Sequence, residues 1–271
     1  MNPCRWPAVL AIVLLGTGFG AAEDKKTEPI RPTETIKLFN GQDLTGFTTW
    51  LKDTKREDPK KVFGVQDGVI RVAGMPMGYL ATDKAYQDYH LSLEWKWGKE
   101  VYGAKGVRNS GILLNAIGPD GGAGGVWMSC IECQLAQGCI GDLIVIRGKD
   151  DKGEVIPTQF TSETALGEDK HPRFKKGGEP RVFTKGQQWW SLHQNFFKED
   201  LDARGKQDVD SPLGEWTKMD VICEGKRITI KVNGTTVNEC YDVFPAAGKI
   251  LLQSEGFEIF FRNVELHPLK K

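Results

Sequence analysis

Short segments of strand-like composition, separated by glycine-containing turns, constrain this chain more than any other feature. The clearest segments lie in the C-terminal third, at residues 217–223, 227–232, 235–241, 249–254 and 258–266. Turns at residues 224–226 and at Asn233-Gly234 join the first three segments. An Asn-Gly pair between two such segments is a strong hairpin signal. We therefore expect a C-terminal antiparallel meander that the last two segments complete.

The same pattern runs through the N-terminal half of the chain. Residues 62–72 contain two β-rich runs around Asp67-Gly68, and residues 89–97 alternate strictly between apolar and polar side chains. Strict alternation is typical of a strand with one buried face. Further strands are expected at residues 110–115, 129–135 and 143–147. Many short strands with little helical periodicity predict an all-β protein, either a sandwich or a barrel.

One stretch, residues 148–212, lacks a clear strand pattern. It contains runs of lysine and aspartate, several glycines and the pair Trp189-Trp190. A loop of this length inside a compact domain is usually functional or disordered. Because of the paired tryptophans, we interpret it as a long loop excursion with a functional role.

Composition limits the classes of protein to consider. The 271 residues include 36 basic and 36 acidic side chains, and 39% are hydrophobic. This length and hydrophobicity allow one large domain or two small ones, and no repeat or change of composition marks a second domain. Zero net charge removes the main reason to expect nucleic acid or an anionic membrane as a partner.

The first 22 residues are typical of a secretory signal peptide. Arg5 supplies a positive charge, residues 8–15 form an apolar run, and the small residues 20–22 suit cleavage. The apolar run is too short to span a bilayer, which takes about 20 residues. We expect residues 1–22 to be removed on export, with an uncleaved anchor as the alternative. Residues 23–35 are expected to form a flexible lead-in, and no stable membrane span follows.

Removal of the signal peptide changes the cysteine count. The full chain has six cysteines, and loss of Cys4 leaves five, so at least one thiol stays unpaired within the monomer. A disulfide between Cys130 and Cys139 would fit an oxidising compartment. Cys223 and Cys240 are expected on strands that flank a third strand, roughly 10 Å apart, which is too far for a disulfide.

The spacing of Cys130, Cys133 and Cys139 resembles a metal-binding pattern only in part. On a strand, Cys130 and Cys133 point to opposite faces, which is wrong for shared chelation. A structural zinc site also needs four ligands. We therefore assign no metal ligands and expect no cofactor, and we leave a bound divalent metal open.

Two pairs of polar side chains share a strand face. In segment 129–135, Glu132 and Gln134 lie on the face opposite the apolar residues, and Gln253 and Glu255 do the same near the C-terminus. A carboxylate beside an amide provides one proton-transfer group and one hydroxyl-orienting group, as a carbohydrate cleft requires. A solvated strand face is the plain alternative.

Aromatic and histidine side chains supply further candidates. Trp95 and Trp97 alternate with leucines and are expected in the core. His193 follows the tryptophan pair and could act as a general base, although a loop histidine is more often structural. His171 and His267 each precede a proline and are expected to be structural. Candidates for stacking on sugar rings are Trp127, Trp189, Trp190 and Trp216.

Several short motifs, taken in order along the chain, resemble those of the 3-keto-disaccharide hydrolase family, also called DUF1080. They are residues 38–47 (LFNGQDLTGF), 78–84 (GYLATDK), 108–111 (RNSG), 131–134 (IECQ), 214–216 (GEW), 252–256 (LQSEG) and 261–263 (FRN). The resemblance spans residues 36–268 and departs at Phe47, where the family usually has tryptophan. It implies a single domain with the concanavalin A-like fold, a jelly-roll β-sandwich of two antiparallel sheets. It also implies a bacterial protein exported to the periplasm or secreted.

The resemblance further implies cleavage of 3-keto-disaccharides or related glycosides already oxidised to a ketone at C3. The ketone acidifies the C2 proton, so a base can remove it, the C1 leaving group departs, and water then adds. On this basis Glu132 is the expected base, and Glu255 or His193 is the expected acid. The remaining site residues are expected to orient hydroxyls, support the enolate or bind and stack on the sugar: Asn109, Gln134, Arg108, Gln253, Trp127 and Trp190.

Two other functions fit the same sequence. A two-carboxylate glycoside hydrolase would need a second acid about 5–9.5 Å from Glu132, which only Glu255 offers among the candidates. A non-catalytic carbohydrate-binding module is the second alternative, because jelly rolls host both roles. A deep cleft around Glu132 would favour an enzyme, and a flat aromatic strip would favour a binding module.

Overall fold

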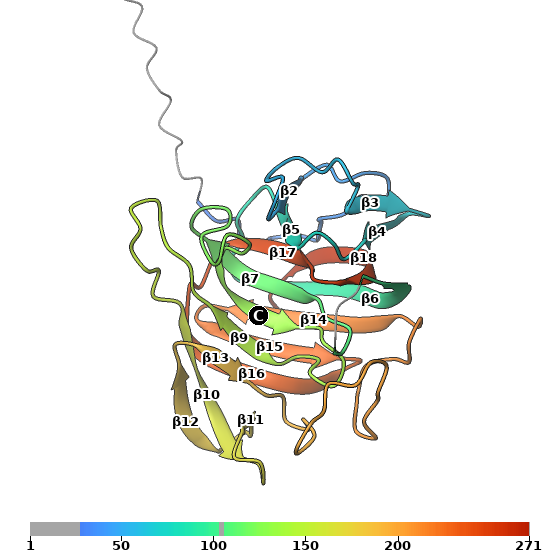
Figure 1. Ribbon diagram of the computed structural model, residues 1–271. Coiled ribbons are helices and arrows are strands. Elements are labelled where there is room, and N and C mark those ends of the chain that lie inside the picture. The colour runs from blue at the N-terminus through green and yellow to red at the C-terminus, as the bar shows by residue number, and fades with distance from the viewer. Residues whose placement is uncertain (1–27, 103–105, 271) are drawn as a thin grey trace, which may run out of the picture.

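Two antiparallel sheets packed face to face form the structure, as Figure 1 shows. The computed structural model describes residues 28–102 and 106–270, and within these ranges it contains strands and turns but no helix. The expected jelly-roll β-sandwich is therefore confirmed. Across the same ranges, no helix has the length and apolar character needed to cross a bilayer.

The larger sheet has 11 strands. Its main path, in spatial order, is β11 (Pro172–Phe174), β10 (Gln159–Leu166), β16 (Thr235–Phe244), β15 (Arg227–Val232), β14 (Thr217–Glu224), β6 (Tyr89–Val101), β18 (Phe257–Pro268), β4 (Val69–Val72) and β3 (Phe63–Gln66). Two strands pair outside this path, β1 (Ile36–Lys37) with β18 and β12 (Glu179–Phe183) with β10.

The smaller sheet has seven strands and carries the candidate site. In spatial order they are β13 (Gly186–Gln188), β9 (Leu143–Ile146), β8 (Ser129–Gln134), β7 (Gly111–Ile117), β17 (Lys249–Ser254), β5 (Gly78–Thr82) and β2 (Phe47–Leu51). Strands β5, β7, β8 and β17 are buried over most of their length on both faces. Other parts of the chain therefore cover much of the outer face of this sheet.

The alternation in residues 89–97 produces the central strand of the larger sheet. Leu91, Leu93, Trp95 and Trp97 of β6 are buried in the core between the sheets, while the intervening residues are partly exposed. The rings of Trp95 and Trp97 meet edge to face at 5.5 Å between centroids. Both tryptophans are core residues, as their spacing predicts.

Asp67 and Gly68 form the tight turn expected between β3 and β4. Gln66 pairs with Val69 across a two-residue loop, and both loop residues have positive φ, 51° and 75°. A type I′ hairpin turn requires positive φ at both positions, which Asp-Gly tolerates well. The sequence prediction of this hairpin is confirmed.

The C-terminal segments are strands, but they do not all belong to one meander. β14, β15 and β16 are sequential neighbours, whereas β17 lies between β5 and β7 in the smaller sheet. The chain then returns to the larger sheet, where β18 pairs with β6. Local turn signals specify neighbouring hairpins, but they carry no information about which sheet a later strand joins.

The expectation of a long loop over residues 148–212 is only partly right, because β10, β11, β12 and β13 lie in this stretch, whereas residues 189–216 form a long connection without a strand. β11, β12 and β13 lie at sheet edges, with β10 next to the edge, and β12 is exposed over four of its five residues. An exposed edge strand needs no apolar alternation, so its sequence does not carry the usual strand signal.

All five cysteines in the described ranges are free and buried: Cys130, Cys133, Cys139, Cys223 and Cys240. The expected Cys130–Cys139 disulfide is therefore wrong. Cys130 lies near the start of β8 and Cys139 beyond its end, and four residues of strand alone span about 13 Å, well beyond disulfide reach. Cys223 and Cys240 lie on strands either side of β15, as predicted.

The predicted signal peptide, residues 1–22, lies outside the described residues, as does the start of the predicted lead-in. The described part of the lead-in contacts the sandwich. Ile30 forms a bridge with Tyr86 and packs against the core, and Arg31 makes an ion pair with Asp88 at 2.6 Å.

Candidate active site on the smaller sheet

Three neighbouring strands bring the predicted polar residues together on the outer face of the smaller sheet. Along β7 and β8, Gly111 pairs with Gln134 and Leu113 pairs with Glu132. Leu251 of β17 pairs with Leu113 from the other side. Residues two apart on a strand share a face, so these side chains form one patch.

The opposite face of the same strands belongs to the core. Ile131 and Cys133 of β8 and Ile250 and Leu252 of β17 are all buried between the two sheets. This is the alternation that places Glu132, Gln134 and Gln253 on the outer face, as the sequence predicts. Glu255 lies in the turn between β17 and β18 and lines the cavity.

Gly111 leaves a gap in the middle of this patch. A Cβ on Gly111 would lie 2.4 Å from Oε1 of Glu132 and 2.9 Å from Oε1 of Gln253. The carboxyl of Glu132 and the amide of Gln253 therefore occupy the space that a side chain at position 111 would fill. The glycine of the Asn109-Ser110-Gly111 motif is explained by this close approach.

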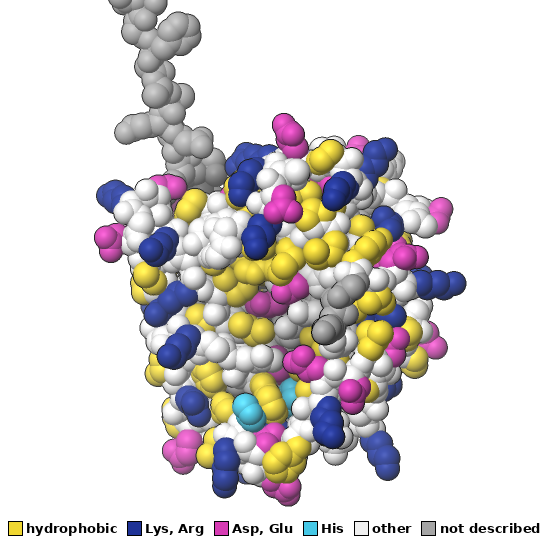
Figure 2. Space-filling model, viewed as in Figure 1, with side chains coloured by type: hydrophobic (Ala, Val, Ile, Leu, Met, Phe, Trp, Pro, Cys, Tyr) yellow, Lys and Arg dark blue, Asp and Glu magenta, His cyan; other side chains and the backbone are white. Residues whose placement is uncertain are grey.

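A cavity of about 380 Å³ opens above the patch. Figure 2 shows the recess, with acidic side chains at its floor and a band of hydrophobic side chains beside it. The lining includes Asn109, Gln134, Gln187, Cys139, Glu199 and Glu255 as polar or reactive groups, and Met75, Met77, Tyr102, Val107, Ala136 and Phe257 as apolar walls. A mostly apolar recess with a few convergent polar groups is typical of small-molecule sites.

The two carboxyl groups of the patch hold their protons to unusually high pH. Burial, and then the negative charge of Glu255, raise the pKa of Glu132 to about 8, and the neighbouring Gln253 only partly offsets this rise. Burial raises the pKa of Glu255 to about 7. Near neutral pH the pair therefore holds about one proton, which is the state needed to accept and supply protons in one cycle.

Several acceptor atoms of the patch have no donor within the described residues. These buried atoms are Oε1 of Glu132, Oε1 of Gln253 and Oδ1 of Asn109. In contrast, Oε1 of Gln134 accepts hydrogen bonds from the backbone N–H groups of Leu135 and Ala136, at 2.9 and 3.2 Å. Its NH₂ group is then the part of Gln134 that is available to a ligand. Buried acceptors without donors are costly, and sugar hydroxyls would satisfy them.

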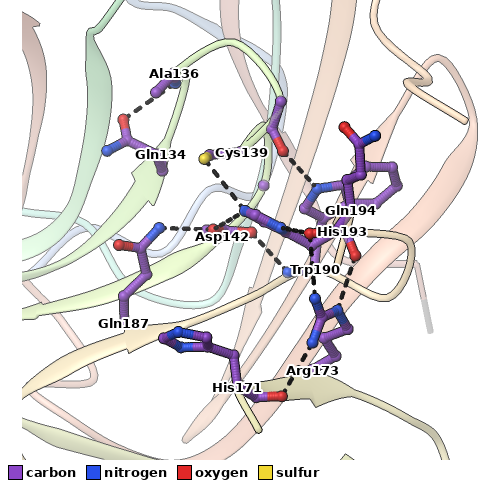
Figure 3. A network of polar contacts seen from close by, with 12 residues as sticks. Gln134, Ala136, Cys139, Asp142, His171, Arg173, Gln187, Trp190, His193 and Gln194 are labelled. Atoms are coloured by element: carbon purple, nitrogen blue, oxygen red, sulfur yellow. Dashed lines mark hydrogen bonds and ion pairs between the residues drawn. The ribbon is translucent and has the colours of Figure 1, made fainter. Parts of the chain in front are cut away.

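A second polar cluster, formed by Cys139, Asp142 and His193, lies at the edge of the cavity (Figure 3). Nε2 of His193 lies 3.3 Å from Sγ of Cys139 and 3.7 Å from Oδ2 of Asp142. All three side chains are buried, and Cys139 lines the cavity. Sequence reasoning considered Cys139 only with Cys130 and Cys133, because nothing in the spacing points to a partner 54 residues away.

The structure corrects the role expected for His193. Its side chain is fully buried and does not line the cavity, and burial lowers its pKa to about 4. At neutral pH the imidazole is therefore uncharged and has no acidic proton of suitable pKa to give to a leaving group. Of the two residues that the sequence offered as the acid, Glu255 and His193, only Glu255 remains a candidate.

Two expected substrate contacts are also corrected. Arg108 is buried and makes hydrogen bonds to Asp202 and to the backbone carbonyl of Gly98, so its guanidinium holds a loop in place. Trp190 is buried in the core, where its indole N–H donates to the carbonyl of Gly138. Neither side chain lines the cavity.

The other three candidate tryptophans lie in three different places. Trp127 packs on the apolar part of the outer face of the smaller sheet and does not line the cavity, and its ring is 6.4 Å from that of Tyr79. Trp189 is stacked between His171 and His193, at 4.1 and 3.7 Å between ring centroids. Trp216 is stacked against Arg262 on a strand of the larger sheet.

Sequence reasoning missed several residues of the cavity. Gln187 and Glu199 lie in the stretch interpreted as a loop, where no alternation assigns a face. Tyr102 lies just beyond the end of β6. In the sequence, only the pair Trp189-Trp190 indicated that this stretch approaches the site. Neither tryptophan lines the cavity: Trp190 is buried in the core, and Trp189 is stacked on His193.

Comparison with models of known protein families identifies the family of this chain. The model of the 3-keto-alpha-glucoside-1,2-lyase-like domain matches residues 34–267, nearly all of the described chain. This chain belongs to the 3-keto-disaccharide hydrolase family. It is therefore a carbohydrate-active jelly-roll protein of the glycosidase-like or lyase-like kind, and the family resemblance noted in its motifs is confirmed. No curated protein matched the sequence.

Two solved structures are similar to this chain, and the first of them supports the same fold. A proposed glycosyl hydrolase from Parabacteroides distasonis ATCC 8503 is 18% identical, with a TM-score of 0.53, over 88% of this chain and 94% of that one. The carbohydrate-binding module CBM66 from Bacillus subtilis is 11% identical, with a TM-score of 0.43, over 82% of this chain and 95% of that one. At these identities the likeness concerns the fold alone.

Substitution of Gly111 tests the gap that holds Glu132. In Gly111→Ala the new methyl group displaces the carboxyl towards the cavity, where water reaches it, so the pKa of Glu132 falls from about 8 towards its ordinary value. Carboxyl titration by ¹³C NMR measures this. Gly64→Ala is the matched control, because a Cβ on that strand glycine meets no atom within 4 Å. An unchanged pKa of Glu132 in Gly111→Ala would contradict the inference that the missing side chain at position 111 makes room for this carboxyl.

The raised pKa of Glu132 also predicts how stability changes with pH. Between the unfolded value of about 4.3 and the folded value of about 8, the folded state binds more protons, so this group lowers the free energy of unfolding as pH rises. Relative to the parent protein, Glu132→Gln is expected to gain roughly 1–4 kcal/mol between pH 5 and pH 9. Urea denaturation at several pH values measures the difference, with the exposed Glu154→Gln as control. A pH-independent difference would refute the assignment.

Proposed function

We propose that this protein cleaves glycosides whose C3 hydroxyl has already been oxidised to a ketone. The observation that carries the proposal is a pair of carboxyls, buried Glu132 and half-buried Glu255, that together hold about one proton near neutral pH at a cavity lined with amide groups. Family membership supports the same reaction class.

The reaction needs one base, one acid and a donor to the enolate. Glu255 removes the proton from C2, and the electron pair of that C–H bond forms an enolate with the C3 carbonyl. The enolate then expels the C1 substituent, whose oxygen takes a proton from Glu132. Water adds across the resulting C1–C2 double bond, with its hydroxyl on C1 and a proton returned to C2, so the sum is hydrolysis.

The positions of the two carboxyls relative to the cavity favour these roles over the reverse. Glu255 has the lower pKa and lines the cavity, so it is the carboxylate that meets the substrate ionised. Glu132 lies deeper and has the higher pKa, so it holds the proton. This assignment exchanges the roles of base and acid that sequence reasoning gave to Glu132 and Glu255.

Amide groups provide the remaining contacts. The free NH₂ of Gln134 is placed to donate to the enolate oxygen, where charge develops in the transition state. Asn109 and Gln253 offer acceptors that lack donors and that suit sugar hydroxyls. Trp127 lies on the same sheet face as the carboxyl pair, where it could contact a second sugar ring.

A two-carboxylate glycoside hydrolase is the second candidate. The coupling between Glu132 and Glu255 favours it, since such enzymes also keep one carboxyl protonated and one ionised. Unmodified disaccharides distinguish the two functions, because β-elimination requires the C3 ketone and direct hydrolysis does not. A non-catalytic binding module is favoured less, because the carboxyl pair lies at a recess and not on a flat aromatic strip.

An assay with purified protein tests the proposed reaction. We expect release of free monosaccharide from a 3-keto-disaccharide and none from the unmodified disaccharide. Because ionised Glu255 and protonated Glu132 are both required, the rate should peak between pH 7 and pH 8 and fall on either side. Glu255→Gln and Glu132→Gln should each lower kcat by about 10²–10⁴-fold.

The exposed Glu154→Gln is the matched control for these variants and should retain the parent rate. Full activity of Glu255→Gln would remove that residue from the role of base. Equal turnover of oxidised and unmodified disaccharides would instead favour the two-carboxylate hydrolase.

Export is part of the same proposal, because residues 1–22 have the features of a signal peptide. We expect the full chain, expressed in a Gram-negative bacterium, to be recovered from the periplasm or medium with Glu23 as its first residue. N-terminal sequencing of the fractionated protein measures this. Recovery from the cytoplasm with residues 1–22 intact would refute export.

A further inference from the structure

Three side chains of different metal-ligand types meet at the edge of the cavity, and they play no part in the reaction proposed above. Cys139, Asp142 and His193 each direct one ligand atom to a common region, and these atoms lie within 4.8 Å of one another. We propose that they form a binding site for one Zn²⁺-like divalent cation, with an open coordination position that faces the cavity.

Two of the three distances between the ligand atoms suit tetrahedral zinc, and the third pair, Sγ of Cys139 and the carboxylate of Asp142, lies within 4.8 Å. With Zn–S near 2.3 Å and Zn–N or Zn–O near 2.0–2.1 Å, ligand atoms in a tetrahedron lie about 3.4–3.6 Å apart. Nε2 of His193 is 3.3 Å from Sγ of Cys139 and 3.7 Å from Oδ2 of Asp142. A cation could therefore sit among the three atoms with only small movements of the side chains.

The orientation of His193 distinguishes a metal site from a nucleophile triad. In a Cys-His-Asp triad the cysteine and the carboxylate contact different ring nitrogens, whereas here both lie near Nε2. Nδ1 lies 3.2 Å from the backbone carbonyl of Gln194, to which it can donate its proton. That hydrogen bond leaves the lone pair on Nε2 directed at the cluster, as in most histidine ligands.

Outer contacts hold the other groups in place. Asp142 accepts hydrogen bonds from the backbone N–H of Trp190 and from the amide of Gln187, both at 2.6 Å. The ring of His193 is stacked on Trp189, which is itself stacked on His171 (Figure 3 shows the surrounding contacts). Such outer-shell support is typical of metal ligands and fixes their geometry before the cation binds.

The position of the cluster gives the cation access to a ligand in the cavity. Cys139 and Gln187 line the same cavity as Glu255 and Gln134. Three protein ligands with one open position are typical of a catalytic zinc site and not of a structural one. A cation there would polarise an oxygen atom of the bound sugar, a role that rests on the proposed function, whereas the binding site itself does not.

Metal binding is tested directly on the purified full-length protein. After incubation with ZnCl₂ and removal of unbound metal, we expect elemental analysis to find one zinc per chain. With CoCl₂ in place of zinc, we expect the near-ultraviolet charge-transfer band of a thiolate–cobalt bond and the visible bands of four-coordinate cobalt. Cys139→Ser should abolish the charge-transfer band, and His193→Gln should abolish stoichiometric zinc binding.

Two controls separate loss of ligands from loss of structure. His171→Gln changes the other histidine that stacks on Trp189 but removes no ligand, so it should bind zinc as the parent does. Gln187→Ala keeps all three ligands but loses the hydrogen bond to Asp142, so its zinc affinity should fall about 10–100-fold. Circular dichroism checks the fold of each variant.

The outcomes of these experiments distinguish failure of the metal site from failure of the proposed reaction. Failure of the parent protein to bind zinc or cobalt, or unchanged binding in both Cys139→Ser and His193→Gln, would overturn the metal site whatever the enzyme activity. Stoichiometric zinc in a protein that does not cleave 3-keto-disaccharides would leave the metal site standing and reject the reaction.

Discussion

The burial of the smaller sheet on both faces is the constraint on which the candidate site depends. Its inner face packs into the core through residues such as Ile131 and Leu252, and its outer face is covered as well. Part of that outer face is apolar, around Tyr79 and Leu113, and the rest carries Glu132 and Gln253. Carboxyl and amide groups are thus held at low solvent exposure, where their interactions are stronger than in water. A free energy cost follows, because three of their oxygen atoms have no donor in the part of the chain that the structure describes.

The same desolvation links the packing of the sheet to the acidity of its carboxyl groups. The pKa values of Glu132 and Glu255 rise chiefly because both groups are desolvated, and only secondarily because their charges interact. A surface pair of the same residues would ionise fully at neutral pH and could not supply a proton. The glycine at position 111 is part of the same arrangement, since it permits the carboxyl of Glu132 to lie flat against the strand instead of reaching into the solvent. Backbone register, side-chain size and acidity therefore depend on one another in this patch.

Strand alternation explains how much of the site could be predicted from sequence. It assigned Glu132 and Gln134 to the face opposite Ile131 because the side-chain period of a strand is two residues. It could not place Arg108, whose partner Asp202 is 94 residues away, nor show that His193 meets Cys139. Long-range pairs of this kind depend on which edge of the sandwich a strand joins. Edge strands such as β12 carry little pattern, so the strands within residues 148–212 were mistaken for a loop.

That stretch is also what completes the cavity. Trp190 is buried in the core, and its backbone N–H donates to Asp142, so the chain that follows β13 is fixed at a definite position beside the smaller sheet. From this anchor, Gln187 reaches the cavity wall and His193 reaches Cys139. The carboxyl pair thus comes from the central strands, whereas the cysteine–histidine cluster depends on the excursion. Because the two groups have separate structural supports, changes in the excursion can alter what the cavity accepts while the carboxyl pair keeps its burial and its shared proton.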